Sequence, residues 1–296
     1  MTDRRDVTAV IVTHDDVERA GRCAASLGLA PDRVIIVANV APSEEVTPWK
    51  CLSPLTSQGY GANINLGVAR SPDGIKWLLL LNDDVVFKRD TLDRLMKAAR
   101  ADPTVGAVTP ALHGEDGGPQ AVAFRHPTVC GEIAGVISGP DLLRRTLRRG
   151  HSVLPAGAGM THEDWVLGAA MLVRSAAFAD VSGFDERYFL YSEDTQFGLD
   201  LQRAGWRSAV LHDAWALHLG AGSTTDARWR DMLLASRRLY VRSNWSRSRF
   251  AGLCGLWVVA QAWNMAYIAV LGIVEPTSRA AHATHARAQL RHPPWR

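Results

Sequence analysis

The feature of this sequence that most constrains its fold is a regular alternation of short apolar runs with segments of helical periodicity. Four runs of strand length consist almost entirely of apolar residues, and they lie at residues 7–13, 33–38, 77–81 and 105–109. Such runs are typical of strands that are buried on both faces. Because strands that alternate with helices form a mostly parallel sheet covered on both faces, the sequence predicts an α/β fold.

Helices are predicted where apolar residues recur at helical spacing. In residues 16–27, for example, Val17, Ala20, Ala24 and Leu27 fall on one face. Further helices are expected over residues 61–69, 91–101 and 193–204, and further strands over residues 166–174 and 210–211. A basic helix is expected over residues 225–247, and an apolar segment follows it.

Composition excludes several classes of protein. Apolar residues make up 47% and charged residues 21% of the 296 positions, which is close to the globular average and excludes disordered and collagen-like chains. The four cysteines lie far apart and form no Cys-x-x-Cys pair, so neither a zinc site nor a disulfide scaffold is expected. The apolar stretch near the N-terminus is too short for a signal peptide. We therefore expect a reducing, cytoplasmic setting.

Positive charge is concentrated towards the C-terminus. Residues 226–296 carry eleven arginines against three acidic residues, whereas the rest of the chain has a net charge of −5. Residues 251–274 carry no charge and are long enough to span a bilayer. Three interpretations stay open at this point: a helix at a membrane surface, a spanning helix and a buried packing helix. Nucleic acid is not an expected partner, because the basic region has no readout motif.

Two adjacent acids stand at the end of a predicted strand. Asn82, Asp83 and Asp84 follow directly after the apolar run 77–81. In open α/β sheets, ligands bind beyond the carboxyl ends of the strands. Carboxylates there suit Mg²⁺ or Mn²⁺ that is bound together with substrate phosphates. The alternative is that the two acids only cap the next turn.

A second acidic pair, Glu193-Asp194, opens the predicted helix 193–204. The helix dipole stabilises acids there as anions, and Ser192 is a candidate N-cap. An acid at the mouth of a cleft can instead accept a proton from a substrate hydroxyl. His218 precedes a glycine-rich loop and is a candidate metal or diphosphate ligand, although a lone histidine more often has a structural role.

Five blocks follow one another along the chain: VTAVIVTHDD (7–16), GYGANINLGVA (59–69), LLLLNDDV (78–85), the block 166–206 and HLGAGST (218–224). Their order resembles glycosyltransferase family 2, and in particular its rhamnosyltransferase-like and galactofuranosyltransferase-like branch, in which the fourth block lies on the acceptor side. The resemblance covers roughly residues 7–225 and extends more weakly to about residue 280. It implies the GT-A fold, a Rossmann-like mostly parallel sheet flanked by helices, here with a C-terminal helical membrane-associating extension.

The resemblance also implies roles for particular residues. Asp194 would be the general base, and Glu193 would support it. Asp84 and His218 would hold Mn²⁺ or Mg²⁺ at the diphosphate of the donor. The residues implied around the nucleotide are Thr13, Asp15, Asn39, Asn65 and Asp83. Family members usually carry an Asp that contacts the pyrimidine where this chain has Ala38, so the nucleotide base is not implied.

Together these expectations describe an inverting hexosyl- or deoxyhexosyltransferase. It would move a sugar from a nucleotide-diphosphate sugar to a hydroxyl of a saccharide or polyprenyl-linked acceptor, at the inner face of the cell membrane. Residues 1–225 would form the catalytic domain, with a nucleotide-sugar half at about 1–112 and an acceptor half at about 113–225, and residues 226–296 the extension. The alternatives are a nucleotidyltransferase of similar fold and a non-catalytic membrane-docking scaffold.

Overall fold

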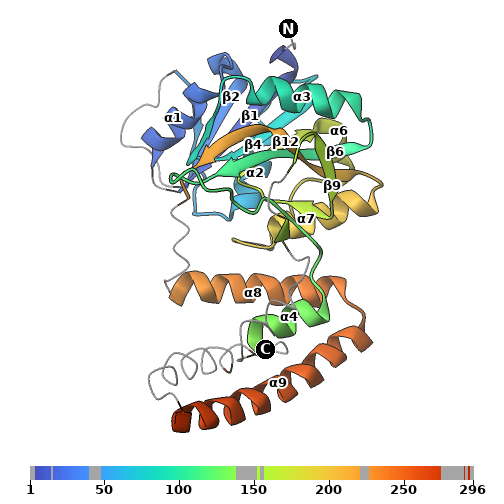
Figure 1. Cartoon of the computed structure of the whole chain (residues 1–296). Coiled ribbons are helices and arrows are strands. Elements are labelled where there is room, and N and C mark those ends of the chain that lie inside the picture. The colour runs from blue at the N-terminus through green and yellow to red at the C-terminus, as the bar shows by residue number, and fades with distance from the viewer. Residues whose placement is uncertain are drawn as a thin grey trace. The chain divides into compact units, whose positions relative to one another are not determined.

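Figure 1 shows a computed structural model of the chain, which describes residues 4–14, 16–39, 48–137, 152–153, 157–220, 227–274, 290 and 293. The chain forms two compact units. The sheet unit comprises Met1–Arg125 and Ser152–Ser223, and the helical unit comprises His126–His151 and Thr224–Arg296. The domain boundary expected at residue 225, and the division of the catalytic domain near residue 112, stay predictions.

The sheet unit is built on a nine-stranded sheet with the order β3-β2-β1-β4-β11-β6-β12-β5, in which β9 also pairs with β12. The strands are β1 (Val7–Thr13), β2 (Val34–Ala38), β3 (Lys50–Leu52), β4 (Trp77–Asn82), β5 (Val85–Phe87), β6 (Val105–His113), β9 (Met160–Glu163), β11 (Ala170–Arg174) and β12 (Arg207–His218). The four predicted apolar runs form β1, β2, β4 and β6, and nearly all their side chains are buried. The predicted α/β class is therefore confirmed.

The sheet is mixed rather than mostly parallel. Strands β3, β2, β1 and β4 are parallel to one another, as expected. Beyond β4, however, β11 is antiparallel to both of its neighbours, and β5 and β9 are antiparallel to β12. The apolar pattern of a strand reports its burial and carries no information on its direction, which is why the sequence did not reveal this half of the sheet.

Two strand predictions differ from the structure. The run 166–174 is split into β10 (Trp165–Val166) and β11, and β10 joins a small sheet with β7 (Ala123–Phe124) and β8 (Ser152–Val153). The short strand expected at 210–211 is the middle of β12, which has 12 residues. The polar residues His212 and Asp213 interrupt its apolar pattern, and its pairing with β6 shifts register between Leu211 and Trp215.

Four helices of the sheet unit lie where the periodicity predicted them (Figure 1), namely α1 (Val17–Ser26), α2 (Tyr60–Val68), α3 (Thr91–Ala101) and α7 (Glu193–Arg203). The sequence did not predict helix α6 (Ser175–Asp180) or the short 3-10 turns at Arg4–Asp6 and Pro31–Arg33. Helix α2 contacts β1 and β2, while α3 contacts β6 and β12. The buried face of α3 consists of Thr91, Leu92, Leu95, Met96 and Ala99.

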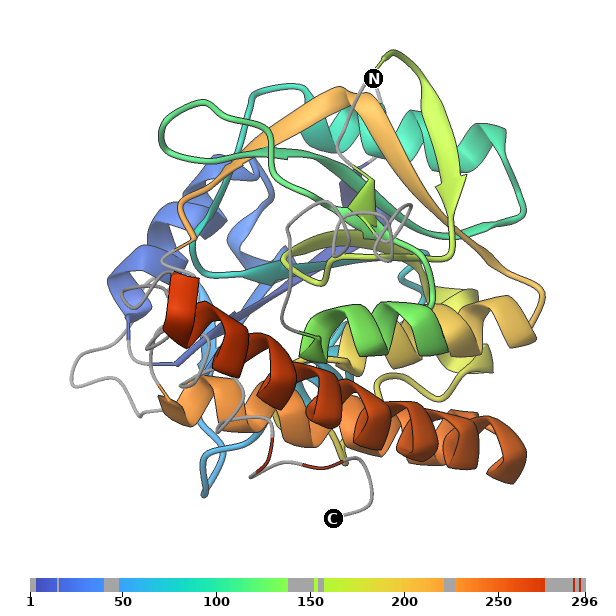
Figure 2. The ribbon, with the colours of Figure 1, turned by 60° about the horizontal axis from the view of Figure 1, so that its bottom comes forward.

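The helical unit contains α4 (Val129–Val136), α8 (Ala227–Asn244) and α9 (Arg247–Val274). Trp245 and Ser246 join α8 to α9, and the two helices run in opposite directions (Figures 1 and 2). An ion pair of 2.7 Å joins Arg237 to Glu132, and the Asn264 amide donates to the Val136 carbonyl at 2.8 Å. Both α8 and α9 are therefore tied to α4.

Helix α9 has a buried face and an exposed face. Its buried positions include Leu253, Trp257, Ala260 and Asn264, and its exposed apolar positions are Leu256, Val258, Val259, Trp263 and Met265. Among the residues that the structure describes, no helix combines the length and the apolar character needed to cross a bilayer.

Candidate active site

The site residues predicted on β1, β2 and β4 gather at the carboxyl edge of the parallel half of the sheet. Thr13 ends β1 and pairs in register with Ala38 at the end of β2. The backbone N–H of Asn39 donates to the Thr13 carbonyl at 3.0 Å, and Asn82 ends β4 beside β1. This edge is where ligands bind in open α/β sheets.

Asp83 is held by the protein itself. The Thr13 hydroxyl and the Arg19 guanidinium, at 2.9 Å, both donate to its Oδ2 atom. The side chain is almost fully buried, and this burial raises the pKa of Asp83, although the bonds from Arg19 and Thr13 act in the opposite direction. Asp83 therefore fixes the turn after β4 and ties it to α1.

Asp84 has a different environment. Its Oδ1 atom is buried and has no hydrogen-bond partner among the described residues, and it lies 3.5 Å from Nε2 of His218. The pairing of β5 with β12 brings the two side chains together, since His218 lies opposite Val85 and the Leu219 N–H donates to the Asp84 carbonyl at 2.9 Å.

The pair of Asp84 and His218 fits a divalent cation. Mg²⁺ holds its ligands at about 2.0–2.1 Å, so two ligands of one ion lie at most about 4.2 Å apart. The 3.5 Å separation meets this condition, and Asp84 Oδ1 lacks any other partner in the described chain. The described residues contain no cluster of three or more His, Cys, Asp or Glu side chains that could hold a metal. Two protein ligands suit an ion that takes its remaining ligands from a substrate diphosphate and water.

The second acidic pair sits at an unusual start of α7. Tyr191 and Ser192 both have positive φ angles, 68° and 64°. Ser192 stands at the N-cap position, as predicted, but its side chain makes no capping bond. The Asp194 carboxylate instead accepts the Thr195 N–H at 2.7 Å and the Gly168 N–H at 3.3 Å. The Glu193 side chain is buried, and its Oε2 atom has no hydrogen-bond partner among the described residues.

Burial sets the protonation of these two carboxyl groups. It raises the pKa of Glu193 strongly, and the neighbouring charge of Asp194 raises it further. Burial also raises the pKa of Asp194, but the N–H groups of Gly168 and Thr195 favour its anion and limit the rise. Although both acids stand at the start of α7, desolvation is the largest influence on the pKa of each. Glu193 keeps its proton to higher pH than Asp194, which stays the more acidic group of the pair.

Tyr60 links the two acidic sites. Its hydroxyl donates to the Gly168 carbonyl at 2.6 Å, next to the N–H that contacts Asp194. The adjacent Ala169 carbonyl accepts the Asn82 N–H at 2.9 Å. The pKa of Tyr60 is raised by burial first, and then by the charges of Glu193, Asp194 and Asp84. Through Gly168 and Ala169, Tyr60 is therefore connected both to Asp194 and to the end of β4.

The other predicted nucleotide residues are used in bonds within the protein. Asn39 bonds to the backbone of Gln58 in both directions at 2.9 Å, and Asn65 bonds to the backbone of Phe184 at 2.8 and 2.9 Å. Asp15 lies outside the described residues. Sequence reasoning did not single out Tyr60 or Gln120, although Tyr60 lies in the glycine- and asparagine-rich block 59–69.

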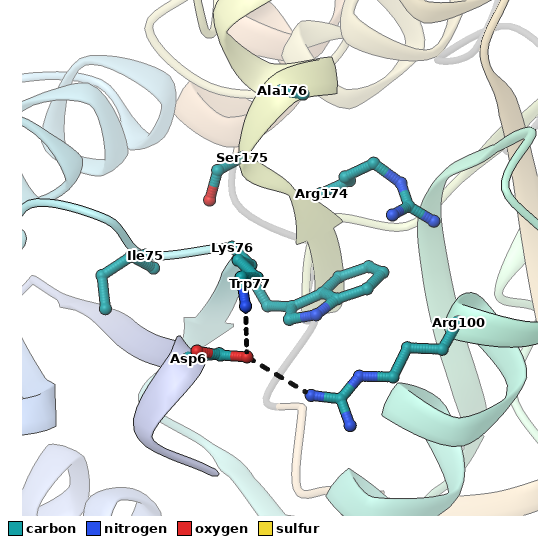
Figure 3. A pocket seen from close by; sticks show the side chains of 8 residues that line it. All are labelled: Asp6, Ile75, Lys76, Trp77, Arg100, Arg174, Ser175 and Ala176. Atoms are coloured by element: carbon teal, nitrogen blue, oxygen red, sulfur yellow. Dashed lines mark hydrogen bonds and ion pairs between the residues drawn. The ribbon is translucent and has the colours of Figure 1, made fainter. Parts of the chain in front are cut away.

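A pocket of about 620 Å³ lies at the opposite edge of the sheet, where β1 and β4 begin (Figure 3). It is lined by Asp6, Ile75, Lys76, Trp77, Arg100, Arg174, Ser175 and Ala176. Asp6 lies 3.1 Å from the Lys76 amine and 3.6 Å from the Arg100 guanidinium. None of the predicted site residues lines this pocket.

Comparison with known proteins gives the class. The family described as "Glycosyl transferase family group 2" matches residues 143–283. The N-acetylglucosaminyl-diphospho-decaprenol L-rhamnosyltransferase of Mycobacterium tuberculosis is 31% identical over 250 residues, which cover 76% of this chain and 78% of that protein. Rhamnosyltransferase WbbL of Escherichia coli is 30% identical over 166 residues, which cover 54% of this chain and 59% of that protein.

Solved structures share the fold. A mannosyltransferase of Pyrobaculum calidifontis, in complex with GDP-Man and Mn²⁺, aligns with a TM-score of 0.55 and 15% identity over 96% of this chain and 86% of that chain. The structure of GalNAc-T7 with UDP, GalNAc and Mn²⁺ aligns with a TM-score of 0.53 and 13% identity over 72% of this chain and 42% of that chain. These similarities confirm the GT-A fold.

The chain belongs to glycosyltransferase family 2. Within that family it is similar to the rhamnosyltransferases, and it is a glycosyltransferase enzyme. The chain is therefore neither a nucleotidyltransferase of similar fold nor a non-catalytic scaffold, the two alternatives that the sequence had left open.

Proposed function

We propose that this enzyme transfers a sugar, with inversion, from a nucleoside-diphosphate sugar to a hydroxyl of a saccharide or lipid-linked acceptor. A divalent cation at Asp84 and His218 would hold the donor diphosphate, and Asp194 would act as the general base. One observation carries the proposal: the segment Gly168–Ala169 bonds both to Asp194 and to Asn82, two residues before Asp84, while the two acids differ in their partners. Asp84 Oδ1 lacks a hydrogen-bond partner in the described chain, whereas Asp194 is held by two N–H donors.

The donor side of the site is formed by residues of β1, the turn after β4 and the end of β12. Asp84 and His218 supply the two protein ligands, and Asp83, fixed by Arg19 and Thr13, keeps the turn in place. The bound cation would neutralise the charge that develops on the departing diphosphate. Because the nucleotide leaves without being protonated, the protein needs no general acid on this side.

The acceptor side has one carboxylate suited to proton transfer. Asp194 is the more acidic member of the pair, so it is ionised under conditions in which Glu193 still holds its proton. Its raised pKa brings it nearer to neutral pH, where a general base works best. Neutral Glu193 avoids placing a second negative charge beside Asp194. One base and no nucleophile suits a single inverting displacement, whereas glycosidases need two flanking carboxyl groups.

The relatives suggest the substrates. The Mycobacterium tuberculosis relative is named as a rhamnosyltransferase acting on N-acetylglucosaminyl-diphospho-decaprenol. By this similarity we propose a deoxyhexose such as L-rhamnose as the sugar and a polyprenyl-diphosphate-linked saccharide as the acceptor. Ala38 stands where family members usually contact the pyrimidine with an Asp, so the nucleotide base is left to experiment.

We further propose peripheral contact of the helical unit with the inner face of the cell membrane. The exposed apolar residues of α9, among them Leu256, Val258 and Val259, suit the interfacial region of a bilayer. The excess of arginine over acidic residues in 226–296 favours anionic lipids. The combined change Val258→Glu and Val259→Glu is expected to release the protein from phosphatidylglycerol vesicles in a sedimentation assay. Undiminished sedimentation would contradict this contact.

The transfer itself is tested with a panel of nucleoside-diphosphate sugars and Mn²⁺ or Mg²⁺. We expect slow metal-dependent hydrolysis of one donor, and its transfer when a polyprenyl-diphosphate-linked N-acetylglucosamine is added. Asp84→Ala is expected to abolish both reactions, whereas Asp6→Asn, at the far edge of the sheet, is the matched control. Full activity of the Asp84 variant, or activity that is independent of metal, would refute the proposed role of Asp84.

A further inference from the structure

We propose that Gln120 is a positioning residue that sets the tautomer of His218 and so presents the lone pair of Nε2 to the cation site. This inference rests on the proposed function of Asp84 and His218. Gln120 contacts His218 twice: its Nε2 atom lies 3.1 Å from the His218 carbonyl oxygen, and its Oε1 atom lies 2.7 Å from the ring Nδ1.

The first contact fixes the orientation of the Gln120 amide. A backbone carbonyl only accepts hydrogen bonds, so the group that faces it must be the NH₂ end of the amide. The opposite orientation would place the amide oxygen against the His218 carbonyl oxygen. The amide oxygen of Gln120 therefore faces the ring, as the structure has it.

The second contact then fixes the tautomer of the His218 ring. An amide oxygen cannot donate, so the Nδ1 atom of His218 must carry the proton of the 2.7 Å bond. In a neutral imidazole the other nitrogen, Nε2, is left with a lone pair. That lone pair lies 3.5 Å from Asp84 Oδ1, a second acceptor without a hydrogen-bond partner in the described chain. Two acceptors that face each other are satisfied together by a cation between them. A bond at the remote nitrogen commonly orients a metal-binding histidine in this way.

The loop that carries Gln120 is braced to keep this geometry. Within the turn between β6 and β7, Gly114 N–H donates to the Gly118 carbonyl at 2.8 Å, and Gly117 N–H donates to the Gly114 carbonyl at 2.9 Å. The backbone N–H of Gln120 itself donates to the Leu112 carbonyl at 2.9 Å, and His113 forms a β-bridge with Pro119. Gln120 is therefore fixed to the end of β6, which runs beside β12, the strand that ends at His218.

Cation binding by the full chain tests the role of Gln120. Mn²⁺ is titrated in the presence of UDP, GDP or thymidine diphosphate, with free Mn²⁺ followed by electron paramagnetic resonance. Gln120→Ala is expected to weaken Mn²⁺ binding by about 10- to 100-fold, the usual effect of losing such a partner. Gln120→Glu keeps an acceptor for Nδ1 but loses the donor to the His218 carbonyl, so its affinity is expected to lie between those of Gln120→Ala and the wild type. Thermal unfolding of both variants verifies that they fold.

The tautomer is read directly by ¹⁵N-histidine NMR of the metal-free protein, with His218→Ala identifying the signal. We expect Nδ1 to be protonated and Nε2 to be unprotonated in the wild type, and this preference to be lost in Gln120→Ala. A wild-type signal with Nε2 protonated, or a folded Gln120→Ala variant with unchanged Mn²⁺ affinity, would overturn the inference alone. Absence of Mn²⁺ binding by the wild type with every nucleotide, or undiminished binding by His218→Ala, would instead overturn the proposed cation site.

Discussion

The substitution Asp194→Asn separates the chemistry of the general base from its structural role. A lost general base usually costs about 10²- to 10⁴-fold in rate, which corresponds to about 3 to 5 kcal/mol of the activation barrier. Asp84 and His218 are unchanged in this variant, so the affinity for the donor should stay nearly that of the wild type. We therefore expect turnover to fall by at least about 100-fold at saturating donor and acceptor.

The structure indicates that this variant still folds, because two effects on stability oppose each other. The amide introduced by Asp194→Asn would keep an oxygen for the Thr195 N–H but would place its NH₂ against the Gly168 N–H, and an unsatisfied buried donor costs about 1 to 3 kcal/mol. In the other direction, burial raises the pKa of Asp194, so the folded state disfavours its anion near neutral pH, a cost that the amide avoids. The two contributions therefore have opposite signs.

The assay compares three quantities in the wild type, Asp194→Asn and the surface control Glu18→Gln, whose carboxylate is exposed. Turnover is measured at saturating substrates, donor affinity by calorimetry and thermal stability by circular dichroism. We expect a loss of turnover with unchanged donor affinity and a melting temperature within a few degrees of the wild type. A folded Asp194→Asn enzyme with near-normal turnover would remove Asp194 from the role of base.

Three further predictions concern the pKa values of Asp194 and Glu193 and the packing of Gly59. The rate should fall as the pH drops through about 6, because the raised pKa of Asp194 means that the base becomes protonated there, and an acid limb near pH 4 in the pH–rate profile would contradict the buried environment. Glu193→Gln should raise the free energy of unfolding more at pH 8 than at pH 5, by about 5 kcal/mol at most. The pKa of Glu193 is raised from 4.5 to about 8 on folding, so the wild type loses stability as the pH rises through that window, and the variant does not. Denaturant titrations at the two pH values measure the difference, and a larger gain at pH 5 would contradict the prediction. Gly59→Ala should lower the free energy of unfolding by about 1 to 3 kcal/mol and reduce turnover, because the added Cβ would lie 2.3 Å from the Phe189 carbonyl oxygen in the segment leading to Glu193. The control is Gly252→Ala, whose added Cβ meets nothing within 4 Å. Equal stability of the two variants would refute this packing argument.

Much of the sheet unit was predictable because its signals are local. Residues 7–13 and 77–82 are buried on both faces, so nearly every side chain is apolar and the strand is visible in the sequence. Helix α3 is equally visible, since Leu92, Leu95 and Met96 recur at the spacing of one helical face. The acids after β4 and at the start of α7 were noticed for the same reason: polar residues stand where an apolar pattern ends.

Other features depend on partners far away in the sequence. The direction of β11 and the length of β12 follow from pairing with neighbouring strands, and a hydrophobic pattern does not encode either. The bond between Gln120 and His218 joins residues 98 positions apart, and no local pattern marks Gln120 as a partner.

The sequence by itself determined the class of fold, the ends of the strands on which the acids lie, and the family. Only the tertiary structure distinguished Asp83, which Arg19 and Thr13 hold, from Asp84, whose Oδ1 atom lies toward His218. Likewise it separated Glu193 from Asp194 by their burial and by the N–H groups that reach one of them. The physical reason is the same in both pairs: neighbouring carboxylates are chemically alike along the chain, and they differ only through the solvent, charges and donors that folding brings to each.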